Sequence, residues 1–360
     1  MKRFILLYIM LVFFIFAVDL SFAENPPKRV TFALVGDIMP GSDFPDSSKI
    51  LPADEGRYLF RYVKKMLSSA DVAIGNLEGT ITRSNNVIKV IQDSTIVVQD
   101  STFVVQDSTT YVFRIPPFLG SRLAEAGFDV LSTANNHAND FGLDGQLETE
   151  SILDSLGIAY TGRKGCIAEL SVNGLQIAVV GFSPNPGKYS LIDIDAATAL
   201  VESLDSRFDI VVVTFHGGAE GEEFTHTPTG QEHFLGEKRG DLRLFVHRVV
   251  DAGADVVFGH GPHVPRGMEL YRNKIIAYSL GNFCTWYGIN VRGVNGLAPL
   301  LWIEVDSEGN LQHMKIVSFE QQSFHYPVPD PDKRAEKLII ELSKTDFGSF
   351  PGEMLLKEDE

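Results

Sequence analysis

Residues 30–37, Val-Thr-Phe-Ala-Leu-Val-Gly-Asp, form a short, mainly apolar run that ends in glycine and aspartate. A run of this length and composition is typical of a β-strand that is covered on both faces. Gly36 and Asp37 stand where that strand would end. Further apolar runs are also followed by polar residues, usually beside glycine. The repeated pattern predicts a sheet with polar side chains gathered at the ends of its strands.

Predicted strands and helices alternate along the chain. The clearest helix is residues 242–250, where Leu242, Phe245 and Val246 begin an apolar stripe with helical spacing. Other helices are predicted at residues 117–126, 146–156 and 333–342, and strands at residues 30–35, 72–74, 130–132, 177–180, 210–215, 256–258, 275–278 and 301–305. Such alternation indicates a layered α/β fold.

The composition is that of a globular protein. The chain has 360 residues, of which 44% are hydrophobic and 22% charged, enough for one large domain or two smaller ones. Its net charge of −16 argues against binding to nucleic acid or to an anionic membrane surface, because both would repel it. Cys166 and Cys284 would allow a disulfide in an oxidising compartment, and two buried free thiols are an equal alternative.

The N-terminus has the pattern of an export signal. Lys2 and Arg3 precede an apolar run over residues 4–18, and the small residues before Glu24 predict cleavage after Ala23. The run is shorter than the roughly 20 residues that a membrane-spanning helix needs. We therefore expect residues 1–23 to be a signal peptide and the protein to be periplasmic, on the cell surface or secreted. An uncleaved membrane anchor is the minor alternative.

The mature chain is predicted to hold one main domain, residues 28–325, and a C-terminal extension, residues 326–360. Within the domain, Gln-Asp-Ser-Thr occurs three times, beginning at residues 92, 99 and 106. A period of seven puts the apolar residues of successive repeats on opposite faces of a strand, so a regular half-buried strand is a poor description. We expect residues 88–112 to be a surface insertion.

Five of the predicted strands are followed by residues that can carry chemistry. In chain order these are Asp37, then Asn76 and Glu78, then Asn136, His137 and Asp140, then His216 and Glu220, and finally His260 and His263. Ligands of open α/β sheets lie beyond the carboxyl ends of the strands, so these side chains are expected to converge. Carboxylates, amides and imidazoles together suit Mn, Fe or Zn.

Each of these motifs is weak on its own. A lone Gly-Asp after a strand is usually a turn, and a lone buried histidine is often structural. The recurrence at five predicted strand ends favours a site for two divalent metal ions, which would support hydrolysis by activating water and neutralising charge on the substrate. His226 and His233 could border this site, whereas His247, His313 and His325 are expected to be solvated or structural.

The motifs together resemble the CapA (PGA_cap) family, which is associated with capsule and poly-γ-glutamate synthesis. The resemblance covers about residues 30–285 and includes the run Ile-Ala-Tyr-Ser-Leu-Gly-Asn-Phe at residues 276–283. The family is similar in fold to the calcineurin-like metallophosphoesterases. The resemblance therefore implies a four-layer α/β/β/α sandwich.

The resemblance also implies roles for individual residues. It makes His137 a catalytic residue beside the substrate, and Glu78 the residue in the place of a bridging aspartate. The implied metal ligands are Asp37, Glu78, Asn136, His216, His260 and His263, while Asn76, Asp140, Glu220, Ser279 and Asn282 would support these ligands or contact the substrate. Residues 279–282 can also be interpreted as a buried strand that ends in a turn. Met39 stands where the phosphoesterases have a histidine ligand, so one ligand of that pattern is missing.

We expect an exported protein of capsule, poly-γ-glutamate or related envelope polymer biosynthesis that hydrolyses a phosphoester or a related bond. Its expected partners are that polymer or substrate and membrane-bound synthesis or export proteins, and not nucleic acid. The alternative is a non-catalytic component that binds or guides an anionic polymer, with a structural or vestigial metal site. Arg266, Arg272 and Arg292 would then be candidates for a basic patch that holds the polymer.

Overall fold

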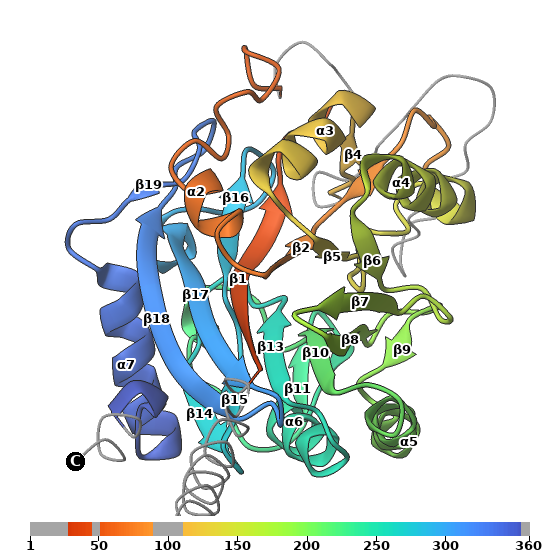
Figure 1. The fold of residues 1–360 in the computed structure, drawn as a ribbon. Coiled ribbons are helices and arrows are strands. Elements are labelled where there is room, and N and C mark those ends of the chain that lie inside the picture. The colour runs from red at the N-terminus through yellow and green to blue at the C-terminus, as the bar shows by residue number, and fades with distance from the viewer. Residues whose placement is uncertain (1–27, 45–50, 89–110, 354–360) are drawn as a thin grey trace, which may run out of the picture.

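Two β-sheets form the centre of the computed structural model, which describes residues 28–44, 51–88 and 111–353 (Figure 1). The first sheet has the strand order β19-β18-β17-β1-β2-β5-β6, and β16 also pairs with β1. Its strands are β1 (Arg29–Met39), β2 (Val72–Leu77), β5 (Val130–Ser132), β6 (Ala159–Thr161), β16 (Asn282–Thr285), β17 (Leu297–Asp306), β18 (Leu311–Glu320) and β19 (Val328–Pro329). Because β1, β2, β5 and β16 are linked by parallel pairing, their carboxyl ends lie at one edge of the sheet.

The second sheet has the strand order β14-β15-β13-β10-β8-β7, and β9 pairs with β8. Its strands are β7 (Ala168–Val172), β8 (Leu175–Ser183), β9 (Tyr189–Ser190), β10 (Ile210–His216), β13 (Val256–His260), β14 (Met268–Tyr271) and β15 (Lys274–Ala277). The central strands β8, β10, β13 and β15 are parallel. Two small pairs complete the strands, β3 (Thr80–Ile81) with β4 (Arg114–Ile115) and β11 (Glu232–Phe234) with β12 (Glu237–Gly240).

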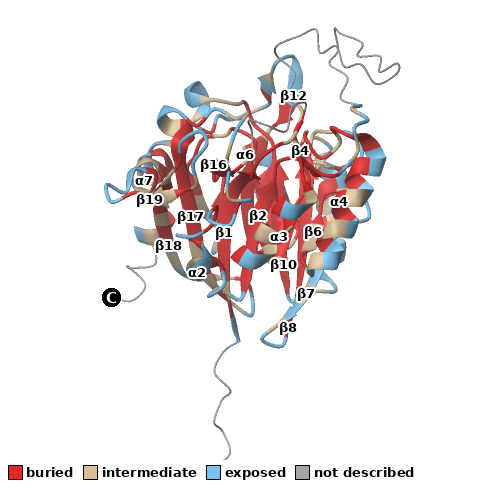
Figure 2. Ribbon diagram, turned by 90° about the horizontal axis from the view of Figure 1, so that it is seen from above, coloured by how far each residue is buried: buried red, intermediate tan, exposed pale blue. Residues whose placement is uncertain are grey.

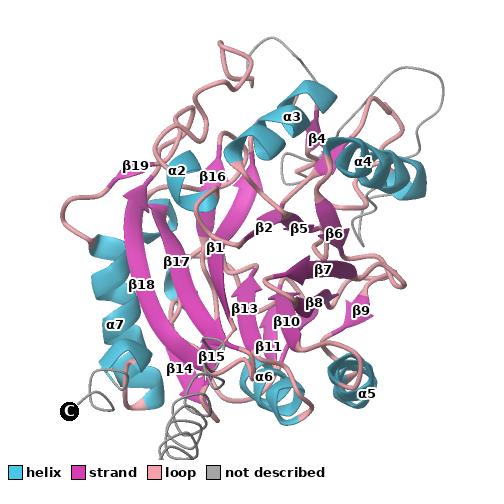
Figure 3. Cartoon of the chain, viewed as in Figure 1, coloured by secondary structure: helices cyan, strands magenta, loops and turns pink. Residues whose placement is uncertain are grey.

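Helices cover the outer face of each sheet, as Figure 3 shows. The helices are α2 (Lys64–Leu67), α3 (Pro117–Ala126) and α4 (Gly142–Leu156) on the first sheet, α5 (Ile194–Asp205) and α6 (Leu242–Asp251) on the second, and α7 (Arg334–Phe347) beside β18 and β14; η1 (Glu222–Phe224) and η2 (Gly293–Gly296) are short 3₁₀ helices. Phe32, Val179 and Phe258 belong to a core cluster between the two sheets. A second cluster lies between the first sheet and its helices, and a third lies between the second sheet and its helices. The chain therefore has four layers, α/β/β/α.

The layered α/β prediction is confirmed. All of the predicted strands and helices are present, and Figure 2 shows their strands buried behind helices with exposed outer faces. The helix predicted at residues 333–342 extends over Arg334–Phe347 and packs on both sheets. The predicted signal peptide and almost all of the predicted insertion lie outside the described residues.

Two further expectations can be compared with the structure. Cys166 and Cys284 are both free thiols, so the disulfide alternative is not realised here. None of the helices in the described part of the chain has the length and the apolar composition needed to cross a membrane.

Candidate metal site

Asp37 is a buried carboxylate near the carboxyl end of β1. Its Oδ2 lies 2.8 Å from Nδ1 of His263, and its Oδ1 accepts a hydrogen bond of 2.8 Å from Nδ2 of Asn76. His260 approaches the same Oδ1 with Nδ1 at 3.7 Å. The backbone N–H of Asp37 donates to the carbonyl oxygen of Gly281 at 2.9 Å, which ties β1 to the turn before β16. Residues from both sheets therefore meet at this carboxylate.

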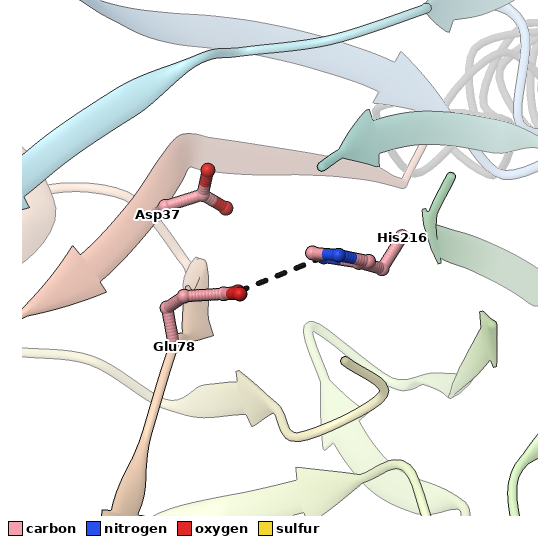
Figure 4. Close-up of side chains that lie close together, drawn as sticks. All are labelled: Asp37, Glu78 and His216. Carbon is pink, nitrogen blue, oxygen red and sulfur yellow. Dashed lines mark ion pairs between the residues drawn. The ribbon is translucent and has the colours of Figure 1, made fainter. Parts of the chain in front are cut away.

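Glu78 follows β2 and is fully buried next to Asp37. The side-chain amide of Asn76 donates to both carboxylates, and Nδ1 of His216 lies 3.6 Å from Oε2 of Glu78. Asp37, Glu78 and His216 offer ligand atoms that all lie within 4.8 Å of one another (Figure 4). These three side chains form a buried group that could hold a metal ion.

Burial and mutual repulsion perturb the ionisable groups of this cluster. Burial, together with the charge of Asp37, raises the pKa of Glu78 to about 8. Burial lowers the pKa of His260 to about 4 and holds the pKa of His216 well below its usual range. Burial would also lower the pKa of His263, but the hydrogen bond to Asp37 and its charge outweigh burial and raise this pKa to about 9. Asp37 and Glu78 are two carboxylates that are buried side by side and only partly balanced by positive charge. A bound cation would stabilise them both.

Several buried polar atoms at the strand ends and in the loop after β5 have no hydrogen-bond partner within the described part of the chain. They are Oε1 of Glu78, Oδ1 of Asn136, both ring nitrogens of His216 and Nδ1 of His260. Buried polar atoms are normally paired, and an unpaired group points to a missing ligand, ion or water. Oγ1 of Thr214 forms a hydrogen bond of 3.0 Å with Nε2 of His260. The other ring nitrogen, Nδ1, faces Asp37. The atoms without partners are carboxylate, amide and imidazole atoms, so the residues present fit a divalent transition metal.

His137 is held in a defined orientation on the loop that follows β5. Its Nδ1 lies 2.8 Å from Oδ2 of Asp140, and the same oxygen accepts a hydrogen bond of 2.8 Å from the backbone N–H of Phe113. The ring of Phe113 packs on the imidazole with 4.3 Å between centroids, and Thr80 Oγ1 donates to the carbonyl oxygen of His137 at 2.8 Å. The side chain is therefore fixed by a carboxylate on one nitrogen and by a ring on one face.

Asn135 connects this loop to β2, a role that the sequence interpretation missed. Its Nδ2 donates to Oδ1 of Asn76 at 2.9 Å and to the carbonyl oxygen of Leu77 at 2.8 Å. Its Oδ1 accepts from the backbone N–H groups of His137 and Ala138, each at 3.0 Å. The available signal was its place directly before Asn136 and His137 in the same motif.

Ser279 and Asn282 support the turn that carries His263. Ser279 Oγ donates to the carbonyl oxygen of Val264 at 2.8 Å, and Asn282 Nδ2 lies 3.1 Å from the carbonyl oxygen of His263. The backbone of His263 has a φ of 57°, which is uncommon for a residue with a side chain. A second amide, that of Asn295, also donates to the His263 carbonyl at 3.2 Å. Both predicted supporting residues thus act on the backbone around His263.

Glu220 lies next to the cluster and is held by an arginine that the sequence interpretation did not identify. Arg239, on β12, is buried, forms an ion pair with Glu220 and donates from Nε to the carbonyl oxygen of Gly218 at 3.1 Å. The negative charge of Glu220 contributes to the raised pKa values of His263 and Glu78. Arg239 reaches the site from the β11–β12 hairpin, which belongs to neither of the two large sheets. It is therefore not part of a strand-end motif of the kind that identified the other residues.

The basic patch expected from three arginines is not formed. Arg266 is fully buried and makes hydrogen bonds of 2.8 and 2.9 Å with the carboxylate of Glu232, while Arg272 pairs with Asp251 at 2.9 Å. Arg266 and Arg272 are thus each paired with a carboxylate, and only Arg266 is buried, because Arg272 and Arg292 are both exposed.

The remaining histidines, all within the described residues, make no contact with the cluster. His226 Nδ1 lies 2.7 Å from Asp346, and His247 lies 2.9 Å from Glu269 and stacks on the ring of Tyr271. Both are structural or surface pairs. His233 is on β11, His313 on β18, and His325 follows β18.

Fold and site together define a four-layer α/β protein whose strand ends bring two carboxylates and three imidazoles into one buried cluster. The chain belongs to the family described as bacterial capsule synthesis protein PGA_cap, whose model matches residues 31–287. This match confirms the resemblance that the strand-end motifs indicated.

Two curated relatives show the extent of the similarity. The chain is 28% identical over 276 residues to the capsule biosynthesis protein CapA of Bacillus anthracis. The aligned region covers 71% of this chain and 60% of the relative. The chain is also 28% identical over 284 residues to the PGA biosynthesis protein CapA of Bacillus subtilis (strain 168), which covers 72% of this chain and 66% of that relative. The chain thus spans less than two thirds of the length of each.

A solved structure with overall similarity is a putative 5'-nucleotidase from Staphylococcus aureus in complex with alpha-ketoglutarate. The match has a TM-score of 0.44 and 14% identity, and covers 86% of this chain and 58% of that one. Because the TM-score is below 0.5, the four-layer arrangement rests on this chain's own strand order and core clusters.

Proposed function

We propose that this protein is a metal-dependent hydrolase that holds two divalent ions of the Mn, Fe or Zn type. The observation that carries the proposal is the group of buried ligand atoms without partners that comes from both sheets. Asp37, His260 and His263 would hold one ion, Asn136 and His216 the other, and Glu78 would lie between them. Mixed nitrogen and oxygen ligands support this choice over Mg or Ca.

Bound divalent ions supply Lewis-acid chemistry by polarising a substrate oxygen and making water a better nucleophile. His137 would act beside them on the leaving group. Because Asp140 accepts the proton of its Nδ1, His137 would hold and transfer a proton at Nε2. Burial of Asp37 and Glu78 strengthens the electrostatic interactions at the site, since water screens them little there.

The proposed substrate is a phosphoester, or a related ester or amide bond, in the biosynthesis of capsule, poly-γ-glutamate or a related envelope polymer. The family and the names of the two relatives support this context. The apolar run at residues 4–18 supports export, and membrane-bound synthesis or export proteins are the proposed partners. The net charge of −16 disfavours nucleic acid as a partner.

A non-catalytic role in binding or guiding the polymer is the second candidate. Met39 is fully buried on β1, two residues after Asp37, where the phosphoesterase pattern has a histidine. A site with one ligand fewer than that pattern would suit a structural ion.

Metal content and turnover of an aryl phosphate test the first candidate against the second. We expect the purified chain to bind up to two Mn²⁺ ions and to hydrolyse para-nitrophenyl phosphate, and His216→Ala to lose both properties. His247→Ala is the matched control, because that imidazole pairs with Glu269 outside the cluster. If the wild-type protein binds no Mn²⁺, the metal site that both candidates assume does not exist. Metal retention without turnover of phosphate, carboxylic ester or amide substrates would favour the second candidate.

A further inference from the structure

An aromatic surface made of two groups of rings lies near the carboxyl end of β1, outside the metal cluster. We define this aromatic surface as Tyr58, Arg61, Tyr62, Trp286, Tyr287, Phe324 and Tyr326. Four of its rings are strongly exposed, at 54% for Tyr58, 42% for Tyr62, 41% for Tyr287 and 48% for Phe324. Its segments come from the regions of α2, β16 and β19, which meet at the upper left of Figure 1. Exposed aromatic rings gathered in this way mark binding surfaces.

Ring contacts hold the aromatic surface in a fixed arrangement. Tyr287 stacks on Phe324 with 5.2 Å between ring centroids, and Trp286 meets Phe324 edge-on at 6.4 Å. The guanidinium of Arg61 lies over the rings of Tyr58, Tyr62 and Tyr326 at 5.6, 5.0 and 5.8 Å. Rigid rings with one exposed face offer contact area at little conformational cost.

The backbone of Phe324 is in the left-handed region, with a φ of 61°. This conformation is a genuine outlier for a bulky residue, and strained residues persist mainly at functional sites. A hydrogen bond of 2.8 Å from the Phe324 N–H to the carbonyl oxygen of Trp286 holds it in place. The strain presents the Phe324 ring to solvent beside Tyr287.

A polar groove of about 540 Å³ is lined in part by the residues that precede Phe324 in the chain. It runs between residues 291–297 and residues 320–323, the latter directly preceding Phe324. Its polar lining consists of Arg292, Glu320, Gln321, Gln322, Ser323 and Arg334. A concave site with a few polar groups beside aromatic rings is the usual form of a small-molecule or oligomer subsite.

The groove contains one unneutralised positive charge. Arg334 forms ion pairs with Glu320 and Asp330. The guanidinium of Arg292 has no hydrogen bond or ion pair with any residue that the structure describes. In a chain of net charge −16, a lone arginine at a groove favours an acidic group on the ligand.

We propose that this groove and the aromatic surface bind an acidic saccharide chain. Sugar rings present C–H faces that stack on Tyr287 and Phe324, and hydroxyl edges that the exposed side chains of Gln322 and Ser323 can bind. Arg292 pairs with an acidic substituent. Poly-γ-glutamate fits less well, because its backbone has no sugar rings whose C–H faces could stack on Tyr287 and Phe324.

The saccharide site and the metal cluster are neighbours. Asn282, whose amide lies 3.1 Å from the His263 carbonyl, also donates to the carbonyl oxygens of Asn290 and Asn295 in the loop that borders the groove. Binding in the groove requires no metal ion, so the proposal stands apart from the hydrolytic function.

Isothermal titration of the full chain in excess chelator tests the proposal. The probes are tetragalacturonic acid, maltotetraose and poly-γ-glutamate. We expect tetragalacturonic acid to bind most tightly, Arg292→Gln to weaken it about tenfold or more, and Tyr287→Ala to weaken both saccharides. Tyr287→Phe should retain binding, since it keeps the ring.

Arg248→Gln and Leu244→Ala on α6 are controls for an exposed charge and an exposed apolar side chain, and should bind as the wild type does. The proposal is overturned if neither saccharide binds, if poly-γ-glutamate binds more tightly than tetragalacturonic acid, or if maltotetraose binds equally well and Arg292→Gln changes nothing. Because chelator is present throughout, a failed metal site leaves each of these results interpretable.

Discussion

Gly36 sits where β1 comes closest to the turn before β16. A Cβ atom at this position would lie 1.9 Å from the carbonyl oxygen of Gly281, so the two backbones could not keep their contact. Gly36→Ala should therefore break the hydrogen bond between the Asp37 N–H and Gly281, displace the Asp37 carboxylate and lower the free energy of unfolding by about 1–3 kcal/mol. Urea unfolding and metal analysis would measure the two effects.

Gly120→Ala on α3 is the control for that substitution. The nearest atoms to a Cβ at Gly120 are 3.4 Å away, which is ordinary contact, and alanine is favoured over glycine within a helix. This variant should be as stable as the wild type or slightly more so. A Gly36→Ala protein with wild-type stability and metal content would show that the close approach is not needed.

Lys188 is a buried cation that lowers the stability of the protein at neutral pH. It is 2% exposed, its Nζ has no hydrogen-bond partner among the described residues, and burial lowers its pKa from 10.5 to about 8. Because the pKa is lower in the folded state, this group costs no stability above pH 10.5, and the cost grows to its full value as the pH falls toward 8. Lys188→Met should thus be more stable than the wild type below pH 8, by up to about 3 kcal/mol.

The advantage of Lys188→Met should shrink steadily between pH 8 and pH 10 in urea unfolding. Lys164→Met is the matched control, because Lys164 is exposed and its backbone N–H donates to the carbonyl oxygen of Gly187 at 2.9 Å, directly beside Lys188. It should show no such pH-dependent difference. A constant difference between Lys188→Met and the wild type across this range would contradict the assigned cause.

At the scale of elements, α7 closes the edge between the two sheets. Ile339 belongs to the core cluster between the sheets, and the backbone N–H of Met268 on β14 donates to Ser343 Oγ at 2.8 Å. Ile339→Ala should lower the free energy of unfolding by about 2–5 kcal/mol, because it removes buried methyl groups and leaves a cavity. Glu341→Ala, at an exposed position of the same helix, should change it by less than about 0.5 kcal/mol. Equal effects of the two in urea unfolding would show that α7 is not integrated into the core.

The strands that were predictable are those buried on both faces. Residues 30–35 and 210–215 are continuous apolar runs, and they became the central strands β1 and β10. β18 was missed because Gln312, His313 and Lys315 interrupt its apolar residues on the more exposed face of the sheet. The hairpin β11–β12 is rich in charged residues and pairs with no other strand. Its sequence therefore shows no alternation of apolar and polar residues from which it could be predicted.

The convergence of the site was predictable for a geometric reason. Parallel strands bring their carboxyl ends to one edge, and this placed Asp37 beside Glu78 and His216. The position of Arg239 was not predictable, because it depends on how a separate hairpin packs over the loop after β10. Local patterns carry no information on such packing between distant segments. The metal-binding roles of Asn136, His260 and His263 remain predictions.

At the scale of the whole molecule, the candidate site joins the two halves of the sandwich. Asp37 and Glu78 come from strands of the first sheet, and His216 and His260 from strands of the second. The contact of 2.8 Å between Asp37 and His263 crosses from one half to the other. A cation bound here would link both sheets and neutralise part of the net charge of −16. Unfolding would have to break that link, so ion binding and global stability should be coupled.

Manganese should therefore stabilise the entire fold. At a free Mn²⁺ concentration of 100 times its dissociation constant, the free energy of unfolding should rise by about 2.7 kcal/mol, and chelator should reverse the gain. Asp37→Asn should lose the response, whereas His247→Ala should keep it. Sodium chloride at matched ionic strength separates this effect from screening of the negative charge, and Mg²⁺ should stabilise less because imidazole ligands suit it poorly. Equal stabilisation of the wild type and Asp37→Asn would place the ion elsewhere on this acidic surface.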